Sequence, residues 1–180
     1  MFCVIRKIVF IFAAGNDKSH ITMSEINQTI NLQVSVDCVL IGFDGEQFSV
    51  LLVRQVGKQS EDGYNNMKLP GSLIYDDEDL DEAAKRVMNE LTGLKNVKLT
   101  QFKAYGSKNR TRNHKDVLWL ERFHRLDEKK IDRIVTIAYL TLVKIDRRFE
   151  QLSDKYDACW TPVSEVKSLA FDHFQILQDA

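Results

Sequence analysis

Hydrophobic and polar residues alternate along the first strongly patterned stretch of the chain. Within residues 34–43, apolar side chains recur at every second position, which is typical of a strand with one buried face. Asp44-Gly45 is a hairpin turn signal, and residues 48–54 are expected to return as the partner strand. The pattern therefore predicts a β-hairpin at the start of the folded region.

The apolar spacing changes to steps of three and four residues between residues 80 and 91. Such spacing places the apolar side chains on one face of an amphipathic helix. The residues on that face are Leu80, Ala83, Ala84, Val87, Met88 and Leu91. We therefore predict a helix whose buried stripe includes Val87 and Leu91.

Later apolar runs predict the remaining elements. Residues 97–105 and 155–160 are expected to be strands. Residues 134–143 (IVTIAYLTLV) are almost continuously apolar and β-branched, as in a buried strand. Residues 116–133 are predicted to form a helical insertion, and residues 172–180 a closing helix.

Length and composition indicate one ordinary globular domain. The chain has 180 residues, of which 44% are hydrophobic and 28% charged. A formal net charge of −1 gives no overall attraction to nucleic acid or to an anionic membrane. The three cysteines are widely spaced and form no CxxC pair, which argues against a disulfide framework or a zinc site and favours a reducing compartment. We expect a cytoplasmic protein with no membrane association.

Residues 1–30 are predicted to be a flexible N-terminal extension, with the folded domain at residues 31–180. The apolar stretch at residues 8–14 is at the lower limit of a signal-peptide core and is too short to span a bilayer.

A spaced motif occupies residues 70–94, PGSLIYDDEDLDEAAKRVMNELTGL, and resembles the Nudix box. That signature is Gly, five residues, Glu, seven residues, and then Arg-Glu-aliphatic-x-Glu-Glu-x-Gly-aliphatic. The matching positions hold Glu78, Arg86, Met88, Glu90, Gly93 and Leu94, with Ser72 at the position of the first Gly. Val87 and Leu91 stand where the family has glutamates, so the box is degenerate.

The resemblance implies a fold of the α/β class (α+β), a Nudix α/β/α sandwich with a mixed sheet. It also bears on whether the chain can catalyse metal-dependent hydrolysis. Positions 87, 90 and 91 cluster on one helix face, and in active family members they present carboxylates to Mg²⁺. Val87 and Leu91 offer hydrocarbon to a cation that requires oxygen ligands. We therefore expect lost or weak hydrolysis, and assign no catalytic residue, metal ligand or cofactor.

A second resemblance lies near the C-terminus, where Trp160 and Pro162 are followed by LAFDH at residues 169–173. This pattern is similar to that of the Nudix-related transcriptional regulators, in which a degenerate Nudix domain precedes a winged-helix domain. The resemblance implies an effector-sensing domain that binds a nucleotide sugar, such as ADP-ribose, or a free sugar. It also implies a homodimer that contacts DNA only through a winged-helix domain lying outside this chain.

Five residues are candidate ligand-binding residues. Glu78, Arg86 and Glu90 of the box are expected at the floor of a pocket beside the helix, with Arg110 and Arg112 at its mouth. These arginines belong to a basic segment, which is either an anion-binding lip or a solvated loop. Arg86 and Glu90 could instead pair only with each other.

The acidic residues 76–82 have two interpretations. Carboxylates at a helix start cap free N–H groups and favour the positive end of the helix dipole. The alternative is a metal-binding loop. Capping is favoured for the segment as a whole, with Glu78 excepted because the box assigns it a position.

Two other functions compete with effector sensing. A Mg²⁺-dependent Nudix hydrolase of a nucleoside diphosphate-linked substrate would have to recruit Glu78, Glu82 and Glu90 as metal ligands. A protein-interaction module would use the fold only as a scaffold. Magnesium-dependent phosphate release distinguishes the hydrolase, and ligand-induced thermal stabilisation distinguishes the sensor from the interaction module.

Overall fold

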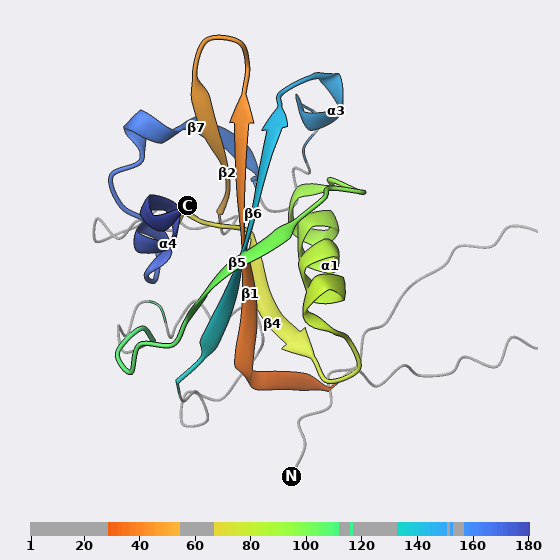
Figure 1. Ribbon diagram of the computed structural model, residues 1–180, viewed down its shortest axis with the longest axis vertical. Helices are drawn as coiled ribbons and strands as arrows, with labels where there is room; N and C mark the ends of the chain where they lie inside the picture. The colour runs from red at the N-terminus through yellow and green to blue at the C-terminus, as the bar shows by residue number, and fades with distance from the viewer. Residues whose placement is uncertain (1–28, 55–66, 112–115, 117–132, 151, 153–156) are drawn as a thin grey trace, which may run out of the picture.

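The structure, a computed structural model, describes residues 29–54, 67–111, 116, 133–150, 152 and 157–180 (Figure 1). Three predictions fall outside these residues: the extension up to residue 28, the helical insertion at residues 117–132, and Arg112.

A seven-stranded sheet forms the centre of the fold. Its strands are β1 (Ile30–Phe43), β2 (Phe48–Arg54), β3 (Met67–Lys68), β4 (Gly71–Tyr75), β5 (Thr100–Tyr105), β6 (Val135–Lys144) and β7 (Cys159–Pro162). The helical elements are α1 (Leu80–Thr92), α3 (Arg147–Glu150), the 3₁₀ turn η3 (Val163–Glu165) and α4 (His173–Asp179). The order is β3-β2-β1-β6-β5, with β4 paired to β1 and β7 paired to β2.

The long strand β1 organises this sheet. One of its edges pairs with β4 and then β2, both antiparallel, and its other edge pairs in parallel with β6 from Val34↔Val135 to Phe43↔Lys144. The sheet is therefore mixed. β1 begins earlier than its apolar alternation suggested because Ile30 pairs with Tyr75 of β4.

Helix α1 begins and ends with recognisable caps. The Asp79 side chain accepts from the Glu82 backbone N–H, and the Glu82 side chain accepts from the Asp79 backbone N–H, which together form a capping box. Gly93 ends the helix in the left-handed region at φ 79°. The favoured interpretation of the acidic segment, helix capping, is confirmed for these two residues.

The two faces of the sheet are covered by different helices, and Figure 1 shows α1 and α4 on opposite sides. On one face, the α1 stripe packs on the even-numbered side chains of β1, such as Val36 and Cys38. On the other face, Ile176 and Leu177 of α4 pack on Val39 and on residues of β2. The predicted α/β class with a mixed sheet is confirmed.

The predicted elements recur with shifted boundaries. β2 matches residues 48–54, and β6 is displaced by one residue from the expected strand. β7 spans Cys159–Pro162, and residues 155 and 156 of the expected strand lie outside the described residues; β5 begins only at Thr100. Among the described residues, no helix is long and apolar enough to cross a membrane.

Candidate functional site

Arg86 of α1 connects the two glutamates that the box motif had singled out. Its Nε and Nη2 donate to the two carboxylate oxygens of Glu78 at 2.8 and 2.5 Å. Its Nη1 lies 3.3 Å from Glu90, and Nη2 also donates to the Leu73 carbonyl at 3.1 Å. The guanidinium lies over the Tyr75 ring, 4.2 Å from its centroid. Arg86 therefore joins α1 to β4 and to the loop before α1.

Electrostatics reinforce this connection. Burial alone would lower the pKa of Arg86, but the hydrogen bonds and charge of Glu78, aided by Glu90, raise it above its ordinary value. Glu78 also accepts from the Tyr75 backbone N–H at 2.8 Å. The carboxylates of Glu78 and Glu90 are therefore already paired with the guanidinium of Arg86.

The two departures from the box motif lie inside the core. Val87 has an exposed fraction of 0% and Leu91 of 3%, and both belong to the cluster between α1 and the sheet. The prediction that they extend the buried stripe of the helix is confirmed. A glutamate at either position would lose its hydration and meet apolar neighbours.

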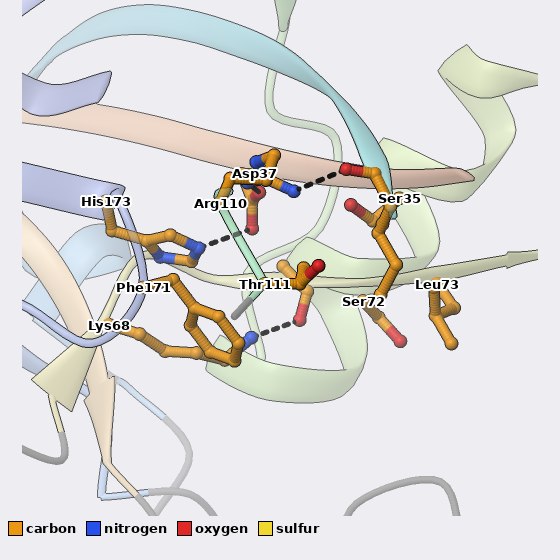
Figure 2. A pocket seen from close by; sticks show the side chains of 11 residues that line it. Ser35, Asp37, Lys68, Ser72, Leu73, Arg110, Thr111, Phe171 and His173 are labelled. Carbon is orange, nitrogen blue, oxygen red and sulfur yellow. Dashed lines mark hydrogen bonds and ion pairs between the residues drawn. The ribbon is translucent and has the colours of Figure 1, made fainter. Parts of the chain in front are cut away.

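A small cavity of about 30 Å³ lies on the α4 face of the sheet, near the N-terminal half of β1 (Figure 2). That volume exceeds the roughly 10–15 Å³ that one water molecule needs. Its walls come from β1, β3, β4, the segment after β5, the residue before β6 and the turn at the start of α4. The lining residues are Ser35, Asp37, Lys68, Gly71, Ser72, Leu73, Arg110, Thr111, Ile134, Phe171 and His173.

Asp37 lies at the centre of a buried polar cluster in this cavity. Its carboxylate accepts from the Thr136 hydroxyl at 2.6 Å and lies 3.4 Å from His173 Nε2. Arg110 Nη2 is 3.9 Å away, and the Lys68 ammonium donates to the Gly71 carbonyl at 2.6 Å. Figure 2 shows Asp37, Lys68, Arg110 and His173 converging from separate elements.

The cluster changes the protonation of its members. Burial alone would raise the pKa of Asp37, but electrostatic interactions with His173, Lys68 and Arg110, aided by the Thr136 hydrogen bond, lower it below its ordinary value. Burial lowers the pKa of Lys68 to about 8, with Asp37 opposing the change. Burial likewise lowers the pKa of His173 to about 4, so its imidazole is neutral at pH 7. The neutral Nδ1 accepts from the Leu69 backbone N–H at 3.1 Å.

Arg110 closes one wall of the cavity. Its Nε and Nη2 donate to the two oxygens of Asp172 at 2.9 and 2.8 Å, and its Nη1 donates to the Ile134 carbonyl at 3.1 Å. The Arg110 side chain is only 4% exposed. Its setting therefore differs from the solvated or lip-like loop that its basic neighbours suggested. Lys103, from the same basic segment, pairs with Asp179 at 2.6 Å.

The five candidate ligand-binding residues are thus divided between two places. Glu78, Arg86 and Glu90 lie together beside α1, whereas Arg110 lines the cavity on the opposite face of the sheet. Arg112 lies outside the described residues.

Three residues of the cavity were not singled out from the sequence, although each carries a signal. Asp37 is the only acidic residue of β1, and Lys68 lies two residues before the motif that begins at Pro70. His173 was noted only as part of the LAFDH pattern.

A mixed sheet with a helix on each face, and the box helix braced by Arg86, define a Nudix fold. The family model described as "NUDIX domain" matches residues 31–180, and the chain belongs to this family. No curated protein matches the chain significantly.

Three solved structures illustrate the similarity. The Nudix domain of Shewanella oneidensis NrtR, complexed with ADP ribose, is 25% identical, with a TM-score of 0.57 over 81% of this chain and 84% of that chain. S. oneidensis NrtR complexed with a 27mer DNA is 25% identical, with a TM-score of 0.58, and is matched over 83% of this chain and 60% of its own. A mutT/nudix family protein from Listeria innocua is 21% identical, with a TM-score of 0.56 over 81% of this chain and 89% of that one, and shows the fold alone.

Proposed function

We propose that this chain is an effector-sensing Nudix domain of a transcriptional regulator, which binds a nucleotide sugar or a sugar and has lost or weak hydrolase activity. The observation that carries the proposal is the burial of Val87 and Leu91 in the core. The helix face that would present a carboxylate cluster instead holds the domain together.

The remaining carboxylates do not fit a magnesium site either. Glu78 and Glu90 are bound to Arg86, and Glu82 completes the capping box of α1. Mg²⁺ requires several oxygen ligands in near-octahedral geometry, and these three glutamates are turned towards other partners. No metal-dependent step is therefore part of the proposal.

The proposed ligand site is the cavity on the α4 face. It offers hydroxyl groups, the Phe171 ring and buried charges that balance one another, which suits a polar, hydroxyl-rich group such as a sugar better than a bare anion. The 25% identical NrtR domain complexed with ADP ribose supports a nucleotide sugar as the first ligand to test.

The same similarity supports DNA as a partner. The NrtR structure complexed with DNA supports a role in transcription, and that protein is longer than the matched region. We expect DNA contact through a separate winged-helix domain, and assembly of this domain as a homodimer.

The test is a calorimetric titration of the purified protein with ADP-ribose and with free sugars. Binding of ADP-ribose or a sugar is expected, together with a higher melting temperature, because a ligand that binds the native state stabilises it by mass action. Lys68→Met should weaken binding, whereas Lys85→Met, at an exposed position of α1, should not. Absence of binding for every ligand class would contradict the sensor function.

The competing function is a Mg²⁺-dependent Nudix hydrolase, because Glu78 and Glu90 are present on the scaffold. It is tested by phosphate or nucleotide release from ADP-ribose in the presence of Mg²⁺. Turnover of roughly 1 per second or faster, abolished by Glu90→Gln, would establish the hydrolase and overturn the sensor. We expect little or no turnover.

A further inference from the structure

The turn at the start of α4 both lines the cavity and attaches the helix to the rest of the domain. Phe171 and His173 line the cavity, while Asp172 and His173 hold α4 on the sheet. A change in this wall of the cavity therefore changes the attachment of the helix. Figure 2 shows Phe171 and His173 on the same side of the cavity.

Several polar contacts fix the turn. Asp172 accepts both hydrogen bonds of Arg110, and His173 Nδ1 accepts from the Leu69 backbone N–H. Asp116 Oδ1 accepts from the Phe171 backbone N–H at 2.9 Å, and the Ala170 N–H donates to the Met67 carbonyl at 2.9 Å. The turn is therefore held to β3, to the segment after β5 and to Asp116.

The backbone within this turn is strained. Phe171 has φ 58°, in the left-handed region that a bulky residue rarely adopts. Such a conformation persists only where surrounding contacts impose it, and it relaxes once those contacts are released. Opening of these anchors would therefore let the backbone of the turn relax.

The volume of the cavity sets a condition on any ligand. At about 30 Å³, the cavity is much smaller than a ribosyl group. Most of its other walls are strands of the central sheet, which are held by ladder hydrogen bonds to their neighbours. Among these walls, the turn at residues 170–173 carries the strained Phe171 backbone, so we take it as the wall that moves.

We propose that a sugar group bound in the cavity displaces the turn at residues 170–173 and thereby loosens α4 from the sheet. The inference rests on the proposed sensor function and adds its output: ligand occupancy is read out as the position of the C-terminal helix. Helix α4 is suited to this role because it is only seven residues long and buries few side chains, chiefly Ile176 and Leu177.

Coupling of this kind is reciprocal, so loosening α4 must strengthen ligand binding. The far end of α4 offers a place to test this without touching the cavity. There, Asp179 accepts from Lys103 at 2.6 Å and from the Tyr105 hydroxyl at 2.8 Å. Neither Asp179 nor its partners line the cavity.

The experiment combines calorimetry with hydrogen–deuterium exchange, and uses ADP-ribose as the probe. Asp179→Asn should bind ADP-ribose about twofold to fivefold more tightly than the wild type, the range expected for loss of an exposed ion pair. Lys103→Met removes the same ion pair from its other side and should act in the same direction. Asp77→Asn, at an exposed position before α1, is the matched control and should leave affinity unchanged. In the wild type, amides of α4 should exchange faster when ADP-ribose is bound.

Each result is decisive. If ADP-ribose binds but α4 exchange is unchanged or slower, or if Asp179→Asn and Lys103→Met leave affinity unchanged or weaker, the coupling is wrong and the sensor function stands. If ADP-ribose does not bind the wild-type protein, the coupling fails because its ligand class is wrong, and the calorimetric titration with free sugars then decides the sensor function separately.

Discussion

Arg110 and Asp172 form an ion pair with two parallel hydrogen bonds, Nε to Oδ2 at 2.9 Å and Nη2 to Oδ1 at 2.8 Å. The pair joins the segment after β5 to the turn before α4, two regions that lie far apart in the sequence. Because Arg110 also donates to the Ile134 carbonyl, one guanidinium ties three parts of the chain together at the cavity.

Removal of this guanidinium should destabilise the domain. Arg110→Met leaves Asp172 without its partner and removes one of the positive charges near Asp37, and should lower the free energy of unfolding by about 3 kcal/mol in urea denaturation. Arg110→Lys should recover only part of the loss, because an ammonium cannot reproduce the planar fork. Lys103→Met breaks an exposed ion pair and should have a much smaller effect; equal losses for Lys103→Met and Arg110→Met would contradict this account.

Gly71 should not tolerate a side chain. A Cβ at this position would overlap the Asp37 carboxylate and approach the Val36 carbonyl, and neither can move without disturbing the sheet or the buried cluster. Gly71→Ala should therefore destabilise the domain by about 3 kcal/mol, measured by chemical denaturation. Gly106→Ala is the control, because its nearest neighbour would be a Val135 methyl group at 3.4 Å. A Gly71→Ala variant as stable as Gly106→Ala would show that the Asp37 region is looser than described.

Carboxylates introduced into the α1 stripe should harm folding more than they help metal binding. Val87→Glu and Leu91→Glu each bury an unpaired acid in the apolar cluster, and each should lower the free energy of unfolding by about 3 kcal/mol at pH 7. Lys85→Glu places the same side chain on the exposed face of the helix and should be nearly neutral. Isothermal titration with Mg²⁺ would show any gain in metal affinity; stable Val87→Glu protein at neutral pH would mean that this position reaches water.

Stability should fall as the solution is acidified through the titration range of His173. The pKa of His173 is about 4 in the folded protein, below its ordinary value of 6.5, because of burial. The unfolded chain therefore binds a proton more readily between these values. The stability contributed by the neutral His173 side chain is fully present above pH 6.5 and is lost as the pH falls towards 4. The free energy of unfolding should change by roughly 2 kcal/mol between pH 7 and pH 5.

The control for this pH effect is His173→Asn. Asparagine can accept from the Leu69 N–H but does not titrate, so the variant should show a smaller loss of stability between pH 7 and pH 5. The other charged groups that face His173 are Asp37, Lys68, Arg110 and Asp172, and all of them remain in the variant. An identical pH dependence in the wild type and the variant would assign the effect to other groups.

The helix and the faces of the strands could be predicted from the sequence because their signals are local. Val87 and Leu91 repeat at helical spacing, and the alternation in β1 already separates Val36 from Asp37. The cavity could not be predicted in this way. Its cluster joins Asp37 to His173 and Arg110, and periodicity shows which face a residue occupies but not which distant residue shares that face.

The same limit explains why Arg110 is buried in the structure although the sequence suggested an exposed loop residue. In the sequence it is one of several basic residues in a loop, and its partner Asp172 lies 62 positions away. A charge whose partner comes from a distant element looks like a surface charge until the fold brings the two together. The box residues Glu78, Arg86 and Glu90 could be grouped from the sequence because helical spacing and the motif connect them directly.

The burial of Val87 and Leu91 also constrains how this domain can evolve. Placing the two glutamates of the Nudix box at these positions requires two separate substitutions, and each intermediate carries an unpaired acid in the core. The stability lost at the first step is a large fraction of the 5–15 kcal/mol that roughly spans the stability of natural domains. Selection for folding alone therefore opposes the appearance of glutamates on this helix face, even in a population where hydrolysis would be advantageous.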